Sequence, residues 1–276
     1  MLISREELIE RLNQIQDNDY KILENVKAYE LALNMLEYLG DTDAALRDDL
    51  VYSTLSRWLT TGLFEKGQLR QILQVVLDDK HLFYKIGESN TNSVFMRAFS
   101  VLIVACIVYS HREDSFLNYE ELIAVKNKVI RYMSEEKDVR DYVAERGWAH
   151  TAAHASDTLD ELAQCEEFGR GELLEILTAI KDKVSIDHHA YICYEDERLA
   201  YATNSLINRN LLTEEEISEW IKSFSEYDKK TAFPNQYYLI ANIRNYLNSL
   251  YYRLPRDQYP VIKAGITDTI LFIRRF

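Results

Sequence analysis

The sequence predicts an all-α fold, and three observations lead to that prediction. The 276 residues include only 8 glycines and 3 prolines, fewer turn residues than sheets and long loops require. Apolar residues recur at helical spacing in most segments, and none alternates convincingly as a strand does. Arginines recur at intervals of about fifty residues, which indicates repeated units. Together these features predict a HEAT- or armadillo-like α-solenoid of about six helical hairpins, forming a single domain over residues 1–276.

In the N-terminal half, capping residues and apolar stripes indicate six helices. Ser4-Arg5-Glu6-Glu7 is a capping box at the start of the first helix, and Gly40-Asp41 ends the second. The segment 94–109 is apolar on nearly every side, so we expect it at the centre of the fold. The expected helices cover approximately residues 4–16, 20–39, 43–60, 69–77, 94–109 and 119–133.

The C-terminal half continues this pattern. Thr213-Glu214-Glu215-Glu216 is a second capping box, and Pro234 and Pro260 stand at positions where a helix can begin. Further helices are expected at about 146–162, 172–183, 195–210 and 234–253, and from residues 213 and 260 onward. The helix 234–253 contains five tyrosines, which we expect in the core rather than on an aromatic binding surface: Tyr237, Tyr238, Tyr246, Tyr251 and Tyr252.

The repeat hypothesis rests on one arginine at or near the start of every second expected helix. These residues are Arg47, Arg97, Arg146, Arg198 and Arg244, at intervals of 50, 49, 52 and 46 residues. The period slightly exceeds the roughly 40–47 residues of HEAT and armadillo units. We therefore expect the five arginines at equivalent positions in successive hairpins, with an accidental ladder as the alternative.

Composition excludes some classes of partner and location. The net charge of −13, with no run of more than two Lys or Arg residues, opposes binding to nucleic acid. The three cysteines are widely spaced without a C-x-x-C motif, as expected of a protein in the reducing cytoplasm. The N-terminus does not look like a signal peptide, and the longest apolar run, 98–109, is too short to span a bilayer, so we expect no membrane association.

The chemistry is concentrated in the segment 146–162. His150, His154 and Asp157 fall within about 60° of one another on the expected helix. At the equivalent positions of neighbouring repeats the residues are mostly apolar. Buried polar groups must be satisfied by partners, so this face requires an explanation.

Three interpretations of this face remain open. The face of His150, His154 and Asp157 would form a hydrogen-bond network between helices, a ligand pocket on the inner surface of the solenoid, or a divalent metal site. His-x-x-x-His presents two imidazoles on one face, and Asp157 would be a third ligand or orient a histidine, although the Glu of His-Glu-x-x-His enzymes is missing. The candidate ligand-binding residues are Trp148, His150, His154, Asp157, Glu195 and Arg198; the candidate metal ligands are His150, His154 and Asp157.

The motif Arg-Gly-Trp-Ala-His-Thr-Ala-Ala-His-Ala-Ser-Asp at 146–157, followed by Glu-Asp-Glu-Arg-Leu-Ala at 195–200, resembles the bacterial family known as domain of unknown function 2785. The segments 46–50 and 95–100 resemble the same pattern, so the likeness runs from about Asp41 to Trp220. Ser156 departs from the family, where alanine is expected. The resemblance implies a helical, cytoplasmic bacterial protein and carries no established activity.

The function most compatible with these features is binding. We expect a cytoplasmic, non-enzymatic helical-repeat protein whose concave surface recognises a protein, a peptide or a small ligand. It needs no cofactor, no nucleic acid and no membrane. The alternative is a metal- or ligand-dependent enzyme whose site is the face of His150, His154 and Asp157, with a divalent metal as its cofactor.

Overall fold

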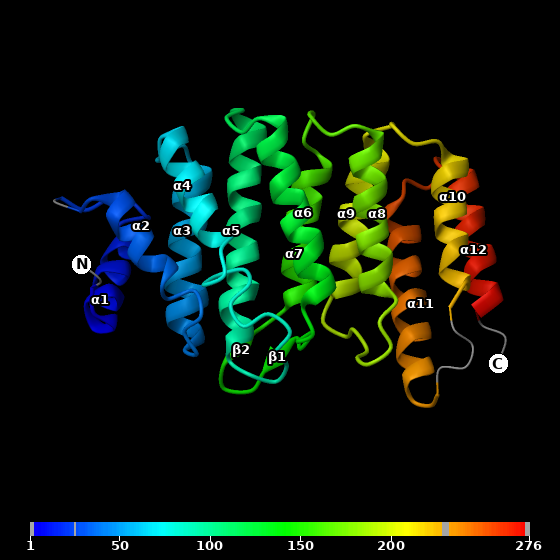
Figure 1. The fold of residues 1–276 in the computed structure, drawn as a ribbon, viewed down its shortest axis with the longest axis horizontal. Coiled ribbons are helices and arrows are strands. Elements are labelled where there is room, and N and C mark those ends of the chain that lie inside the picture. The colour runs from blue at the N-terminus through cyan, green and yellow to red at the C-terminus, as the bar shows by residue number, and fades with distance from the viewer. Residues whose placement is uncertain (1–2, 25, 228–231, 274–276) are drawn as a thin grey trace. The chain divides into compact units, whose positions relative to one another are not determined.

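The computed structural model describes residues 3–24, 26–227 and 232–273. Within these residues 66% of the chain is helical, in twelve α-helices, and the strands form a single two-stranded sheet (Figure 1). The all-α prediction is therefore confirmed. The chain divides into two compact units, residues 1–158 and 159–276, with the boundary inside α7 (Thr151–Ala163).

The first unit contains six complete helices, a π-helical segment and a β-hairpin. In chain order these are α1 (Arg5–Asp17), α2 (Ala28–Leu36), η1 (Ala45–Tyr52), α3 (Ser53–Thr60), α4 (Lys66–Val76), α5 (Ser93–Glu113), α6 (Tyr119–Glu135), β1 (Tyr142–Val143) and β2 (Gly147–Trp148), followed by the start of α7. The expected helix 20–39 is shorter in the structure, where α2 begins only at Ala28, and the left-handed Asp19 and Tyr20 (φ 54° and 58°) separate α1 from the segment before α2.

Helix α5 is the core of the first unit, as its all-round apolar sequence predicts. Nearly every residue from Ser93 to Val108 is buried, and α3 and α4 pack against it. At 21 residues α5 is longer than its apolar run 98–109, so by length and composition it could cross a membrane. However, 83% of its most apolar 18 residues are buried inside the protein, as in the core helix of a folded domain.

Hydrogen bonds in the first unit repeatedly join residues about fifty positions apart. The Arg70 guanidinium donates to Glu121, 51 residues ahead, and Ser110 Oγ donates to the Leu59 carbonyl oxygen, also 51 residues away. Arg140 donates to the carbonyl oxygen of Thr91 across 49 residues. These bonds join α4 to α6, α3 to α5, and the segment after α6 to the loop before α5.

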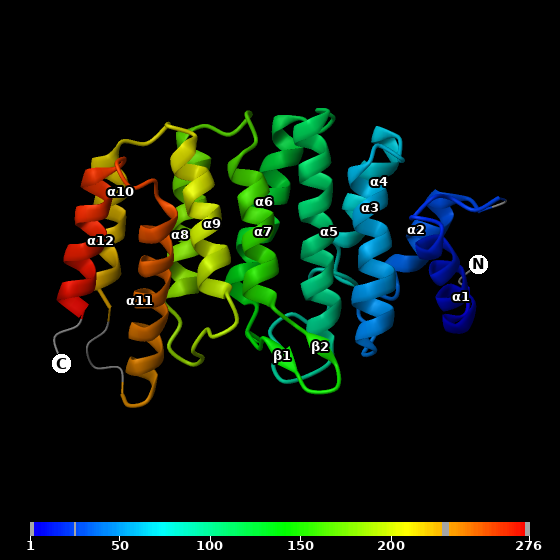
Figure 2. The same cartoon turned by 180° about the vertical axis from the view of Figure 1, so that it is seen from behind.

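The second unit contains the end of α7, then α8 (Arg170–Val184), α9 (Glu195–Asn208), α10 (Glu214–Lys222), the 3₁₀ turn η2 (Ser223–Ser225), α11 (Asn235–Arg253) and α12 (Pro260–Ile273). Here α9 packs against α8 and α11, and α10 packs against α12 (Figure 2). Similar ties recur: Arg170 pairs with Glu216 across 46 residues, and Tyr191 N donates to Asn242 across 51.

The arginine ladder is wrong as a set of equivalent residues. Arg47 and Arg97 are fully buried near the starts of η1 and α5, and Arg198 is exposed near the start of α9. Arg146 lies in the turn between β1 and β2, and Arg244 is exposed in the middle of α11. Of the five, Arg47 and Arg97 alone are fully buried, so the regular spacing does not correspond to equivalent positions.

The tyrosines of α11 also differ from expectation. Tyr246 is buried and its hydroxyl pairs with Thr203 Oγ1 at 2.7 Å. The other four, Tyr237, Tyr238, Tyr251 and Tyr252, are exposed. Only one side of α11 packs against α8, α9 and α12, so tyrosines at other helical positions remain on the surface.

Candidate functional site

The segment 146–162 is a hairpin strand followed by a helix, and not one continuous helix. Tyr142 pairs with Trp148 and Val143 with Gly147 in an antiparallel register, and α7 begins only at Thr151. Gly147 (φ 81°) and His150 (φ 47°) have left-handed backbones, which a right-handed helix cannot contain. The expected helix is therefore wrong for its first five residues.

Gly147 is required where the hairpin meets η1. A Cβ atom at this position would lie 2.8 Å from Ala44 Cβ and 3.0 Å from Nη2 of Arg47. Its left-handed φ is also strained for any other residue type. Behind the hairpin, Val94, Phe95 and Ala149 form a buried cluster, so the strands are held beside the start of α5 (Figures 1 and 2).

Arg47 joins the hairpin to the core. Its Nη2 donates to the carbonyl oxygen of Arg146 and its Nη1 to that of Asp41, both at 2.8 Å. The guanidinium lies over the Phe95 and Phe99 rings, at 4.2 and 4.8 Å from their centroids, so it is held between aromatic and polar partners. Burial lowers the pKa of Arg47 in spite of the nearby carboxylates.

Asp48 is the adjacent acid. Its Oδ1 lies 2.7 Å from Nε of Arg47. Burial raises the pKa of Asp48 to about 6, which shows that desolvation outweighs the attraction of the Arg47 charge. Asp48 was not identified from the sequence, because its burial depends on the docked hairpin.

A continuous series of ring contacts leads from this core to the surface. Phe99 meets His154 edge to face at 5.4 Å, and His154 meets His150 at 5.8 Å. His150 is stacked on Trp148 with centroids 4.3 Å apart and an interplanar angle of 20°, and Trp148 meets Tyr142 at 5.1 Å. Exposure rises along the series, from 5% for His154 to 40% for Trp148 and 56% for Tyr142.

The buried end of this series is fixed by α5. Nδ1 of His154 lies 3.2 Å from the carbonyl oxygen of Ala98, and Thr158 Oγ1 donates to that of Val101 at 2.7 Å. Asp157 is half-buried one turn further along α7. The structure thus brings Trp148, His150 and His154 into contact and shields His154 from water.

The two remaining candidate residues belong to the second unit. Glu195 is buried at the start of α9, and its Oε2 accepts a hydrogen bond from Cys193 N at 2.9 Å. Arg198 is exposed one turn later. Glu195 therefore supports the connection before α9, and His188 and His189, in that same connection, are exposed and half-buried respectively.

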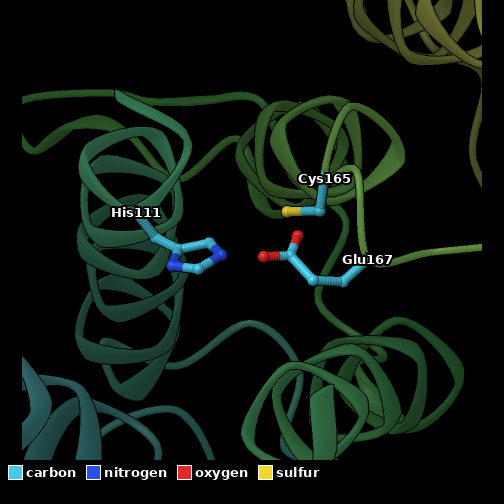
Figure 3. A group of neighbouring side chains, drawn as sticks. All are labelled: His111, Cys165 and Glu167. Atoms are coloured by element: carbon cyan, nitrogen blue, oxygen red, sulfur yellow. The ribbon is translucent and has the colours of Figure 1, made fainter. Parts of the chain in front are cut away.

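Figure 3 draws three further side chains that can ligate metal, two from the second unit and one from the first. In the first unit, His111 is buried at the end of α5, and its Nδ1 accepts hydrogen bonds from the backbone N–H groups of Phe116 and Leu117 at 3.0 Å. His111 thus fixes the turn that follows α5. In the second unit, Cys165 and Glu167 follow α7, and Arg209 donates to the Cys165 carbonyl oxygen.

Sequence reasoning missed two hollows in the first unit, because they depend on how helices pack. One, of about 620 Å³, is lined by Tyr38, Asp41, Tyr84, Lys85, Glu88 and Ser93, among others. The other, of about 410 Å³, lies between α4 and α6. No sequence motif marks either one.

A sequence model of the family described as Protein of unknown function (DUF2785) matches residues 82–252, more than half of the 276 residues. The chain belongs to this family. The match includes all six candidate ligand-binding residues of the DUF2785 protein. It begins later than the resemblance seen from Asp41 and extends beyond Trp220. No curated protein and no solved structure matches the chain.

Proposed function

We propose that this DUF2785 protein is a non-enzymatic binding protein of the cytoplasm, built as a HEAT-like α-solenoid. The hydrogen bonds between residues 46 to 51 positions apart, present in each unit, support a repeated helical architecture. The three cysteines are free, as expected in a reducing compartment. Helical-repeat proteins use extended surfaces for recognition, which makes a protein or peptide the favoured ligand.

One observation carries the binding proposal: an exposed aromatic pair is fixed in place by the protein core. Tyr142 and Trp148 face each other across the hairpin, and Trp148 stacks on His150. Tyr and Trp provide large contact areas and dominate binding hot spots. Because these rings are already ordered, little conformational entropy is lost when a ligand covers them.

The hydroxyl groups beside the histidines fit this reading better than catalysis. Ser156 Oγ donates to the Ala152 carbonyl oxygen at 2.6 Å, and Thr158 Oγ1 donates to that of Val101 at 2.7 Å. Both hydroxyls are thus engaged by backbone acceptors. His154 is likewise next to a backbone carbonyl oxygen. These groups hold α7 in place and orient the rings that lead to Trp148.

Selection from a phage-displayed peptide library on the immobilised full-length protein tests this proposal. We expect enriched peptides to bind the free protein with micromolar dissociation constants in fluorescence anisotropy. Trp148→Ala should weaken them at least tenfold, because a hot-spot truncation typically costs more than 1 kcal/mol. The matched control is Tyr109→Ala, an exposed aromatic of α5. Failure to enrich any peptide, or equal loss in both variants, contradicts the proposal.

The alternative is a divalent metal centre in an enzyme, and one observation favours it. His150 and His154 have ring centroids 5.8 Å apart, close enough to approach a common group, with Asp157 one turn on. Metal analysis of protein purified without an affinity tag decides between the two functions. Stoichiometric zinc or manganese, lost in His154→Ala, would support the enzyme and overturn the binding proposal.

A further inference from the structure

The groove between α4 and α6 is a candidate ligand site separate from the aromatic hairpin. It measures about 410 Å³, within the roughly 300–1,000 Å³ typical of small-molecule pockets. Apolar side chains from both helices line it, with polar groups among them. The lining residues are Arg70, Leu73, Gln74 and Leu77 on one side and Leu117, Glu121, Ala124, Val125 and Lys128 on the other.

Polar bridges cross the groove near each end. The Arg70 guanidinium pairs with Glu121, with Nε 2.9 Å from Oε1, and Lys128 Nζ donates to the Leu77 carbonyl oxygen at 3.0 Å. Both helices advance seven residues between the two bridges, so they run in the same direction and the bridges are about 10 Å apart. This length suits one short alkyl chain and is too short for a long helix of a partner protein.

The two ends differ in their capacity to bind a further group. Arg70 donates to both Glu121 and the carbonyl oxygen of Phe116, so its guanidinium nitrogens Nε and Nη2 are already engaged. Lys128 is exposed and, among the residues that the structure describes, donates one hydrogen bond, to Leu77 O, while an ammonium group has three donors. The charged groups of the lining are Arg70, Lys128 and Glu121, so the groove is locally positive in a protein of net charge −13. An anionic group of a ligand would therefore be attracted to Lys128.

We propose that this groove binds a free medium-chain fatty acid. Its carboxylate would accept hydrogen bonds from Lys128, and its alkyl chain would lie along Leu73, Leu77, Leu117 and Val125. An extended chain of eight to ten carbons is about 9–11 Å long, since each C–C bond of about 1.5 Å advances a zigzag chain by about 1.25 Å. That length matches the spacing of the bridges. The site takes no part in the hairpin recognition proposed above.

Isothermal titration calorimetry of the full-length protein tests the proposal with hexanoate, octanoate and decanoate. We expect affinity to rise about three- to fourfold per added methylene group, since each is newly buried. Decyltrimethylammonium, which carries the same chain with the opposite charge, should bind at least tenfold more weakly than decanoate. No binding of decanoate, or equal binding of both amphiphiles, overturns the proposal.

Two substitutions locate the binding to the groove. Ala124→Trp, at an exposed wall position, should abolish decanoate binding by filling the space, whereas Ser134→Trp on the same helix should not. Lys128→Glu should weaken binding at least tenfold. Its control is Lys137→Glu, because Lys137 also donates to a backbone carbonyl oxygen but lies outside the groove.

Circular dichroism verifies that each variant is folded. If Ala124→Trp is not folded, Gln74→Trp on the facing wall takes its place, since Gln74 is also exposed. Decanoate binding that persists unchanged in the folded Trp variant places the ligand elsewhere and overturns the proposal. This result leaves the peptide experiment unaffected, because that experiment depends on Trp148.

Discussion

Arg47 and Arg97 are both fully buried, fifty residues apart, yet their surroundings differ. Arg97 faces Glu136 in a two-pronged pair, with Nε–Oε2 at 2.5 Å and Nη2–Oε1 at 2.9 Å. Burial lowers the pKa of Arg97, but Glu136 outweighs this and raises it overall. For Arg47 burial prevails over the attraction of Asp48, whose Oδ1 lies 2.7 Å from Nε of Arg47, and its pKa is lowered.

The two arginines therefore stabilise different parts of the first unit: Arg97 a loop, and Arg47 the hairpin. Arg97 also donates to the carbonyl oxygens of Tyr84 and Glu88, and so fixes the loop before α5. Arg47 instead reaches the hairpin carbonyl oxygen of Arg146 and packs on Phe95 and Phe99. The less compensated charge thus supports the hairpin that carries Tyr142 and Trp148, the pair proposed to bind a ligand.

The largest effect is expected from Arg97→Met. This change leaves the buried carboxylate of Glu136 without the Arg97 cation, which typically costs about 3–5 kcal/mol. The midpoint of thermal unfolding should fall by roughly 6–20 °C, measured by calorimetry. Adding Glu136→Met should recover much of the loss, because the buried carboxylate that lost the Arg97 cation is then removed as well. A double variant no more stable than the single one contradicts this account.

Arg47→Met should have a smaller effect on stability and a larger one on the hairpin. It leaves two carbonyl acceptors, those of Asp41 and Arg146, without their donor, at about 1–3 kcal/mol. The indole N–H signal of Trp148 in the NMR spectrum should shift and broaden, whereas in Arg97→Met that signal should stay in place. Equal shifts in both variants would show that the two arginines do not differ in role.

The smallest effect concerns Asp48, whose pKa is raised to about 6 from 3.8. The folded state therefore favours the protonated acid, and this contribution is present below about pH 4 and lost as the pH rises through 6. Relative to Asp48→Asn, the wild type should lose roughly 1 kcal/mol between pH 4 and 7, allowing for partial exposure to solvent. Urea denaturation at four pH values measures the difference. A constant difference across this range would show that Asp48 has an ordinary pKa.

The sequence predicted the helices better than the site. Capping boxes such as Ser4–Glu7 and Thr213–Glu216 and the apolar run of α5 are local signals, and the structure has helices at each. The hairpin was missed because its left-handed residues, such as Gly147, depend on docking against Ala44 and Arg47. His150 and His154 were recognised as an unusual polar pair, but Tyr142, the outermost ring of the series, carries no local signal.

The π-helical segment η1 has a consequence for how this protein tolerates insertions and deletions. A π turn contains more residues than an α turn, so side chains after it are rotated relative to those before it. Within η1, Arg47 and Asp48 point to the hairpin, while α3 directly behind it packs against α1 and α5. Deletion of one residue from η1 would rotate the side chains of Arg47 and Asp48 by about 100° relative to those of α3. The length of this segment is thus constrained from both sides, and we expect evolutionary drift in the family to change its residues while preserving their number.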